Sequence, residues 1–557
     1  MIKKQWWHGK VAYQIYPKSF QDTNGDGIGD LRGIINRLDY LKQLGIDIVW
    51  LSPIYQSPFV DQGYDISDYY KIAQEFGTME EFDELLEEAK KRGISIIMDL
   101  VINHCSDQHE WFQKALQDPE GEYAKYFYFV KGKNGQVPNN WRSYFGGSVW
   151  EPVPNSDYYY LHFFAKEQPD LNWTNETLRK NLYDMINWWL EKGLAGFRID
   201  AIMNIKKDTT FPSYEPDCED GTVHVAKMIE SVEGIEDYLR ELHDETFKKY
   251  DAFTVGEVFN MKKEQLANMI GNDGVFSTIF DFSQHTLTQG EGEWYEEHHW
   301  TFDDWKKTLY ESQKEVEDIG MYANILENHD EPRAASRFLP PYAQNEKGIK
   351  AIATVSLLAK GIPFIYQGQE IGMTNCPVDS MEQYDDISTK DQYQEALRAG
   401  YSKEQALEIC QRFSRDNART PMQWSDEDYA GFSTTKPWLF LNPNYKTINV
   451  KAQQQEKHSI LKYYQALIKL RKEKEYQEVF TYGTFQPLYE DMEGIVAYER
   501  KDEHHTIVII VNLSDQTKEI PFTTEQAQLL LSNVEHIQLS EQRLILQSCE
   551  AGIFLRK

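Results

Sequence analysis

Three carboxylates in this chain lie at the ends of short apolar runs, a placement that suggests a catalytic role. They are Asp200, Glu257 and Asp330. Paired carboxylates without an obvious set of metal ligands suit glycoside hydrolysis, in which one attacks the anomeric carbon and another protonates the leaving oxygen. Arg198 shares a strand face with Asp200, and this adjacent cation is expected to keep the Asp200 carboxylate ionised. For this strand taken alone, a purely structural Arg–Asp pair is the alternative.

The elements that must position these groups alternate between strands and helices. Apolar runs typical of strands are centred near residues 12, 49, 98, 199, 255, 279, 325 and 365. Amphipathic patterns predict helices over 30–44, 79–92, 178–192, 348–360 and 459–472. This alternation implies parallel pairing, and eight such units close into a (β/α)8 TIM barrel. An open doubly wound sheet is the alternative, but no Gly-rich dinucleotide-binding fingerprint follows any strand.

A barrel would bring the chemically active residues together, because active sites of such barrels lie at the C-terminal ends of the strands. The carboxylates, two histidines and an arginine then meet at one mouth: His104, Arg198, Asp200, Glu257, His329 and Asp330. Their convergence favours catalysis over a structural ion pair.

The alternation is interrupted in ways that predict the domain organisation. We expect the barrel to comprise 1–104 and 173–475, with a domain B at 105–172 inserted after the third strand. A polar, loop-rich insertion is expected at about 373–445. From 476 to 557 the pattern changes to short alternating runs, which predict a C-terminal antiparallel β-sandwich.

Composition narrows the class of protein. The 557 residues carry a net charge of −31, which argues against nucleic acid and anionic membranes as partners. The N-terminus does not resemble a signal peptide, and no apolar stretch approaches the length that spans a membrane. Five scattered cysteines indicate neither a disulfide framework nor a zinc site. We therefore expect a cytoplasmic protein, as a monomer or homodimer.

Six motifs give the chain a specific resemblance. They are DLVINH (99–104), QPDLNW (168–173), GFRIDAI (196–202), TVGEVF (253–258), ENHDEPR (327–333) and IPFIYQGQEIG (362–372). In order and spacing they resemble glycoside hydrolase family 13, the α-amylase-type enzymes. The segments GYDISDYY (63–70) and SRDNARTPMQW (414–424) are similar to the oligo-1,6-glucosidase and α-glucosidase branch. The resemblance implies a barrel, a domain B after strand three and a C-terminal β-sandwich.

The resemblance also implies roles for individual residues. Asp200 would be the nucleophile, Glu257 the general acid/base, and Asp330 the group that holds two hydroxyls and stabilises the transition state. The implied substrate-binding residues are Asp61, Tyr64, His104, Phe164, Arg198, Ala201, His329 and Arg415. Among these, Asp61, Tyr64 and Arg415 match positions that close the pocket, and Phe164 matches an aromatic wall. A closed pocket permits only exo attack, so one α-glucose would be released at a time with retention of configuration.

Bond specificity depends on the residue after the nucleophile. In the resembling branch this residue tends to be Val where α-1,6 bonds are preferred, and Ala or Thr where α-1,4 bonds are preferred. Here it is Ala201, which favours an α-1,4-glucosidase acting on maltose and short malto-oligosaccharides, although Ala201 could merely pack in the barrel. The nearest alternative is an oligo-1,6-glucosidase. Less favoured are enzymes acting on sucrose or trehalose-6-phosphate, and a non-catalytic sugar-binding relative.

A loop after the first strand has the pattern of a calcium site. Oxygen ligands recur at alternate positions, from Asp22, Asn24, Asp26, Ile28 and Asp30. An Asx-rich turn without metal is the alternative. Because the resembling branch commonly carries a structural ion in such a loop, we expect structural Ca²⁺ here and no organic cofactor.

Overall fold

A closed barrel of eight parallel strands forms the centre of the computed structural model, which describes residues 2–132, 135–259, 263–289, 294–296, 298–523 and 527–556. Its strands are β1 (Ala12–Ile15), β2 (Ile48–Leu51), β5 (Ser95–Leu100), β10 (Gly196–Ile199), β12 (Phe253–Gly256), β13 (Thr278–Asp281), β14 (Ala323–Ile325) and β15 (Ile362–Tyr366). Each coincides with one of the eight runs in the sequence. The (β/α)8 prediction is therefore confirmed, and the open sheet is excluded because β1 pairs with both β2 and β15.

Helices surround the barrel where the amphipathic patterns predict them. They include α1 (Leu31–Leu44), α2 (Met79–Lys91), α4 (Glu176–Glu191), α11 (Glu346–Leu358) and α16 (Ile460–Lys472). Local signals set their ends: the Asp30 side chain caps α1, and Gly45 ends it in the left-handed conformation at φ 101°. Large apolar side chains such as Trp50, Phe253 and Phe364 fill the barrel interior, as a packed core requires.

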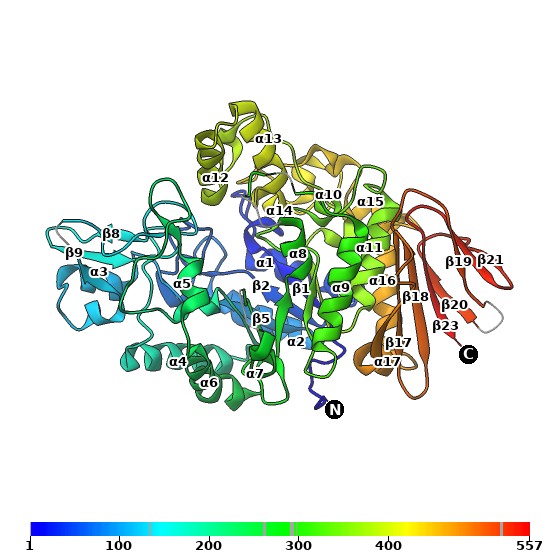
Figure 1. The fold of residues 1–557 in the computed structure, drawn as a ribbon, viewed down its shortest axis with the longest axis horizontal. Helices are drawn as coiled ribbons and strands as arrows, with labels where there is room; N and C mark the ends of the chain where they lie inside the picture. The colour runs from blue at the N-terminus through cyan, green and yellow to red at the C-terminus, as the bar shows by residue number, and fades with distance from the viewer. Residues whose placement is uncertain are drawn as a thin grey trace.

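The chain between β5 and α4 forms a separate lobe, at the left of Figure 1. It contains α3 (Glu110–Gln117) and an antiparallel sheet of β6 (Phe129–Lys131), β9 (Tyr158–Leu161) and β8 (Trp150–Pro152). A further short strand there, β7 (Trp141–Arg142), pairs in parallel with β11 (Val223–His224) from the segment after β10. The segment that follows Asp200 is thus attached to this lobe.

The insertion that we expected to be loop-rich also contains helices. Figure 1 shows α12 (Ile387–Arg398) and α13 (Lys403–Phe413) at the top of the molecule, above α14 (Asp416–Arg419). The Asp386 side chain caps α12, and a capping box of Ser402 and Gln405 begins α13. Few residues of α12 and α13 are buried, so these helices lack the long apolar face of a barrel helix, whereas their caps were readable in the sequence.

The C-terminal residues form two antiparallel sheets. One has the order β16 (Thr484–Leu488), β17 (Ile495–Lys501), β18 (Thr506–Asn512), β23 (Ala551–Arg556), β20 (Ala527–Ser532), and the other β19 (Lys518–Pro521), β22 (Arg543–Leu546), β21 (Gln538–Ser540). Apolar side chains from both sheets, such as Val508 and Leu544, share one buried cluster. This arrangement confirms the predicted antiparallel C-terminal domain.

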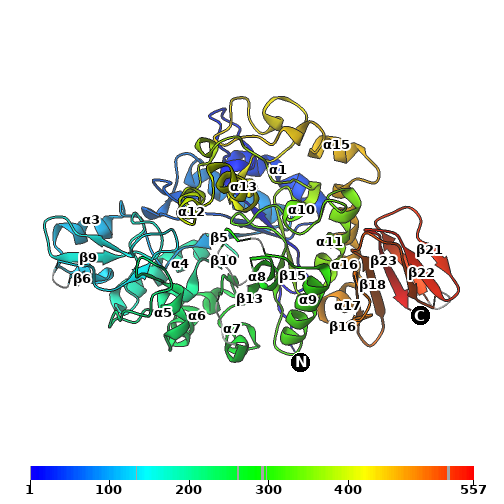
Figure 2. The same ribbon diagram turned by 45° about the horizontal axis from the view of Figure 1, so that its top comes forward.

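The C-terminal sheets lie against α9 (Phe302–Val316) and α11 of the barrel, at the right of Figure 2. Tyr310 of α9 donates to the Ala497 carbonyl, and Tyr498 donates to the Val355 carbonyl of α11. The exact domain boundaries that we predicted stay predictions. Nowhere in the described ranges is a helix both long and apolar enough to cross a membrane, and the cytoplasmic location likewise stays a prediction.

Candidate active site

A cavity of about 420 Å³ lies at the C-terminal ends of the barrel strands, where β10 leads into Asp200 and β12 into Glu257. Nine of the predicted catalytic and substrate-binding residues line it: Asp61, Tyr64, His104, Phe164, Asp200, Ala201, Glu257, Asp330 and Arg415. The other two, Arg198 and His329, are buried directly behind the lining and contact its carboxylates. The structure therefore brings all eleven together, while their individual roles stay predictions.

Arg198 links three carboxylates at the base of the cavity. Its Nη1 lies 2.7 Å from Oδ1 of Asp99 and 2.7 Å from Oδ1 of Asp200, and its Nη2 lies 2.6 Å from Oε1 of Glu257. The other oxygen of Asp99 accepts hydrogen bonds from Trp50 Nε1 and Tyr64 Oη. Asp99 stands in the DLVINH motif, but sequence reasoning assigned it no role. Here it fixes the guanidinium that holds both Asp200 and Glu257.

Opposing influences act on the pKa of Asp200. Burial raises the pKa of Asp200 well above its usual value; Arg198 opposes this rise, and the negative charges of Glu257, Asp99 and Asp330 add to it. Arg198 contacts Asp200 and lowers its pKa, although this one guanidinium is shared among three carboxylates. Asp200 is consequently a carboxylate that is costly to ionise in this cavity. The expectation that Arg198 keeps Asp200 ionised stays a prediction.

Ala201 occupies an unusual backbone conformation beside these carboxylates. After β10 ends at Ile199, the chain turns through Ala201 at φ 41°, ψ 37°, in the left-handed region that residues other than glycine seldom adopt. Its N–H donates to Oε2 of Glu257 at 2.9 Å. The residue after the presumed nucleophile therefore orients the second carboxylate through its backbone, and such strain is typical of functional sites.

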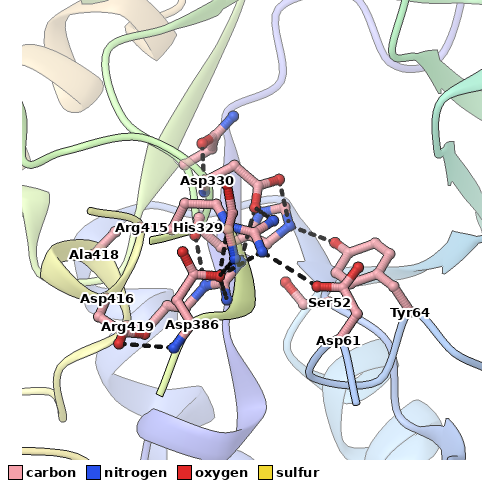
Figure 3. Close-up of polar contacts among 12 residues, drawn as sticks. Ser52, Asp61, Tyr64, His329, Asp330, Asp386, Arg415, Asp416, Ala418 and Arg419 are labelled. Carbon is pink, nitrogen blue, oxygen red and sulfur yellow. Dashed lines mark hydrogen bonds and ion pairs between the residues drawn. The ribbon is translucent and has the colours of Figure 1, made fainter. Parts of the chain in front are cut away.

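Asp330 lies in a strongly cationic environment, drawn in Figure 3. Its carboxylate is 2.9 Å from His329 Nε2, 2.8 Å from Arg419 Nη2 and 3.2 Å from Arg415 Nη1. Burial alone would raise the pKa of Asp330, but His329, Arg415 and Arg419 outweigh burial and hold this pKa well below its usual value. Asp330 is thus ionised.

One end of the cavity is closed by an ion-pair network. Arg415 Nη2 lies 3.2 Å from Oδ1 of Asp61, and the same guanidinium contacts Asp330 and Asp386 (Figure 3). Gln168 Nε2 donates to Asp61 at 3.1 Å and lies 3.2 Å from His104 Nε2. These contacts join residues 61, 104, 168, 330, 386 and 415, which come from distant parts of the chain, at this end of the cavity.

Sequence reasoning missed two members of that network. Asp386 pairs with Arg415 and lies 3.6 Å from Arg419 Nη1, while Arg419 also donates from Nε to the His329 carbonyl. Arg419 lies within the SRDNARTPMQW motif, so its position was visible there. Asp386 precedes a helix as a capping residue, and nothing in its local sequence indicates that it also faces an arginine pair.

Aromatic rings form a continuous wall from the closed end outward. Phe164, which we predicted as a wall residue, lies with its ring centre 5.0 Å from that of His104. Tyr144 stacks on Phe164 at 5.0 Å, and His224 meets Tyr144 edge to face at 5.1 Å. Aromatic faces of this kind pack well against the apolar faces of sugar rings.

The predicted metal loop lies away from the cavity. The carboxylate of Asp22 accepts hydrogen bonds from loop amides and from Ser433 Oγ, and Asp30 caps α1 and accepts from Thr23. Within the described ranges, no three His, Cys, Asp or Glu side chains are grouped so that they could hold a metal ion. The contribution of Asp22, Asn24, Asp26, Ile28 and Asp30 to a calcium site stays a prediction, and no chemical step depends on it.

The chain is similar in sequence and in fold to several known proteins. Residues 14–483 match the family model for the α-amylase catalytic domain. A probable oligo-1,6-glucosidase from Bacillus subtilis (strain 168) is 43% identical over 565 residues, covering 100% of both chains. Among solved structures, trehalose-6-phosphate hydrolase from Bacillus licheniformis is 39% identical with a TM-score of 0.91. Isomaltulose synthase from Erwinia rhapontici NX5 is 38% identical with a TM-score of 0.94, and both structures cover 100% of each chain.

Proposed function

The chain belongs to the α-amylase family of glycoside hydrolases, and from this premise we propose that it is an exo-acting, retaining α-glucosidase. The observation that supports exo action best is the closed end of the cavity, where Arg415 joins Asp61 to Asp330. A substrate can place only its terminal glucosyl unit there. Each catalytic cycle would then release one glucose from the non-reducing end.

The arrangement of carboxylates suits a double displacement. Asp200 attacks the anomeric carbon while Glu257 protonates the departing oxygen; Glu257 then removes a proton from the water that hydrolyses the glucosyl–Asp200 ester. Because configuration inverts twice, the product is α-glucose. Arg198 contacts both carboxylates and so fixes their separation. The ionised Asp330 is suited to bind sugar hydroxyls and to stabilise positive charge at the anomeric carbon.

We further propose a preference for α-1,4 bonds, as in maltose and short malto-oligosaccharides. Ala201 lines the cavity next to Asp200, and its N–H is bound to Glu257. The small side chain leaves space beside the scissile bond, which fits the Ala or Thr found at this position in α-1,4-acting members of the resembling branch.

The second candidate is an oligo-1,6-glucosidase that acts on isomaltose, and the name of the 43%-identical relative favours it. A phosphorylated substrate is disfavoured by charge. Among the described residues that line the cavity, Arg415 is the single Lys or Arg, and three carboxylates already pair with it. A phosphate would instead meet the carboxyl groups of Asp200 and Glu257.

Initial rates of glucose release from maltose and isomaltose, measured side by side at equal concentrations, test the proposal. We expect maltose to be preferred, and Ala201→Val to shift the ratio toward isomaltose while lowering both rates, because a β-branched residue is strained at φ 41°. A strong isomaltose preference of the unmodified enzyme would favour the second candidate. Hydrolysis of neither sugar would contradict both.

A further inference from the structure

We propose that a second cavity, at the opposite end of the barrel from the catalytic residues, binds a small phosphorylated anion. This cavity, which we call the basal cavity, has a volume of about 270 Å³ and lies at the N-terminal ends of β12 and β13. The N-terminus, α6 (Ile235–Glu245) and α7 (Leu266–Ile270) lie in this region, along the lower edge of the molecule in Figure 1. The binding of an anion here does not depend on the proposed α-glucosidase function.

The basal cavity lies where the pairing of β12 with β13 begins. The first pair of the ladder is Val255 with Thr278. Before this pair, the Thr254 amide donates to Ser277 Oγ at 3.1 Å, and the Ser277 amide donates to Thr254 Oγ1 at 2.9 Å. Thr254 and Ser277 both line the cavity. Two side chains thus take the place of ladder hydrogen bonds, and the cavity occupies the end of the barrel next to them.

The segment that precedes β1 forms one wall of the basal cavity, with Lys3 and Trp7 in the lining. The Lys3 amide donates to Asn272 Oδ1 at 2.8 Å, and Trp6 Nε1 donates to the Asp251 carbonyl at 3.0 Å. Trp7 is buried and belongs to the apolar cluster of the barrel interior. The wall that carries Lys3 is therefore attached to the barrel at several points.

The charge of the basal cavity is opposite in sign to that of the catalytic cavity. Three cations and two carboxylates line the basal cavity, namely Lys3, Arg240, Lys248, Asp251 and Asp273, whereas four carboxylates and one arginine line the catalytic cavity. Burial lowers the pKa of His8 to about 4 and also lowers that of His243, so these two lining residues add no charge at neutral pH. The lining thus has an excess of positive charge in a chain whose net charge is −31. A positive cavity attracts anions.

Two of these cations have no carboxylate partner. Among the described residues, neither Lys3 nor Arg240 forms an ion pair, whereas Lys248 lies 2.9 Å from Asp244. Arg240 donates from Nη2 to the Asp273 carbonyl at 2.8 Å, and this bond holds the guanidinium beside the cavity. The lysines and aspartates of the lining are exposed and Arg240 is half-buried, so the charge of Arg240 is the least screened. A guanidinium with free N–H groups matches the geometry of phosphate oxygens.

Trp7 leaves a third donor unpaired. Its Nε1 is buried and has no hydrogen-bond partner in the part of the chain that the structure describes. Buried donors in folded proteins are nearly always paired, so this N–H calls for an acceptor that the chain does not supply. A phosphate group has three strong acceptor oxygens for the donors of Lys3, Arg240 and Trp7.

The size of the basal cavity limits the rest of the ligand. Small-molecule sites typically have volumes of about 300–1,000 Å³, and the basal cavity lies at the lower end of that range. This volume favours inorganic phosphate, or a phosphate ester with a few carbon atoms, over a nucleotide or an oligosaccharide.

Calorimetric titration of the full chain with inorganic phosphate and with glycerol 3-phosphate, each compared with KCl at equal ionic strength, tests the proposal. Glycerol 3-phosphate is chosen because it has no glucose ring that could enter the catalytic cavity. We expect one site per chain with a Kd below about 1 mM. Tighter binding of the ester would identify an organic phosphate as the ligand, and equal affinities would identify inorganic phosphate. Binding of neither, or equal heats with KCl, would overturn the proposal.

Three variants locate the site. Arg240→Gln should weaken binding by about tenfold, and Lys3→Gln by about threefold because Lys3 is exposed. The matched control is Lys4→Gln, since Lys4 is the next residue but pairs with Glu478 and does not line the cavity. Lys4→Gln should leave the Kd unchanged. Thermal unfolding without ligand establishes that each variant is folded, and Lys3→Gln keeps the test decisive if Arg240→Gln is not. Unchanged affinity in a folded Arg240→Gln or Lys3→Gln, or an equal fall in Lys4→Gln, would contradict the assignment.

Discussion

At the scale of single residues, the candidate site consists of carboxylates in opposite electrostatic environments. Asp200 shares one guanidinium with Glu257 and Asp99, whereas Asp330 contacts His329, Arg415 and Arg419. Burial therefore dominates at Asp200 and raises its pKa, and the cations dominate at Asp330 and lower its pKa. The cavity thus holds two aspartates whose pKa values are shifted in opposite directions.

Removal of the proton donor should affect poor leaving groups most. We predict that Glu257→Gln lowers kcat/KM for maltose by about a thousandfold, because the departing oxygen is then no longer protonated. The loss should be much smaller for a nitrophenyl α-glucoside, whose leaving group needs little protonation. Steady-state kinetics on both substrates checks this. Equal losses on the two would contradict the assignment of Glu257 as general acid.

The two aspartates should have opposite effects on stability. A raised pKa for Asp200 means that its contribution to stability is fully present below the pKa of the unfolded chain and is lost as pH rises through the folded pKa. Asp200→Asn should therefore raise the free energy of unfolding at neutral pH by on the order of 1 kcal/mol, and this gain should disappear in acid.

For Asp330 the pKa is lowered, so its contribution is present above the unfolded pKa and is lost as pH falls through the folded pKa. Asp330→Asn should destabilise at neutral pH by about 2 kcal/mol, since charge-assisted hydrogen bonds are lost. Thermal unfolding of both variants at several pH values provides the measurement. A shift of the same sign in both variants at neutral pH would contradict the opposed environments.

At the scale of elements, two buried arginines bind the C-terminal end of α11, and one of them, Arg500, joins a C-terminal sheet to the barrel. Arg500 of β17 donates to the carbonyls of Leu358 and Gly483, and Arg471 of α16 donates to those of Leu357 and Ala359. Both guanidinium groups therefore bind carbonyls at or just beyond the end of α11, groups that a helix cannot satisfy internally. Burial lowers the pKa of Arg471 to about 9 and that of Arg500 to about 10.

Replacement of Arg500 should weaken this junction. We predict that Arg500→Met destabilises the protein by about 2 kcal/mol, because two buried carbonyls lose their donors. Removal of the charge repulsion between Arg500 and Arg471 offsets only part of this loss. Arg543→Met is the control, since Arg543 is paired with Glu519 at the surface and should matter little. Urea unfolding of both variants and of the unmodified protein measures these changes in stability. Equal stability of Arg500→Met and the unmodified protein would show that these hydrogen bonds are not needed.

Sequence periodicity was sufficient for the regular elements. All eight barrel strands and the helices α1 and α16 could be predicted, because buried strands are continuous apolar runs and barrel helices have one apolar face. The pairing of β11 with β7 could not, since two-residue strands carry no periodic signal. The raised pKa of Asp200 was also out of reach, because it depends on burial and on Asp99 and Glu257, which are distant in the sequence.

At the scale of the whole molecule, the loop expected to bind calcium connects the start of the barrel to the insertion before α16. Asp22 binds Ser433, and the Gly27 carbonyl accepts from the Trp438 amide. The loop contributes no residue to the cavity lining. An ion there would therefore stabilise the junction without taking part in the reaction.

Chelation tests this expectation. We predict that EGTA lowers the unfolding temperature, that added Ca²⁺ restores it, and that kcat at moderate temperature is unaffected. Asp26→Asn should abolish the response to Ca²⁺, because Asp26 is an expected ligand and has no contact with the cavity. An unfolding temperature that is the same with and without chelator would show that the loop is an Asx-rich turn without a calcium requirement.

The most direct test of the account is to trap the covalent intermediate. A 5-fluoro-α-glucosyl fluoride forms the glucosyl–enzyme quickly and releases it slowly, so the modified peptide can be identified by mass spectrometry. We predict one label per chain, on the peptide that carries Asp200, and no label in Asp200→Asn. A label on another carboxylate, or turnover of the unmodified enzyme to β-glucose, would contradict the double displacement at Asp200.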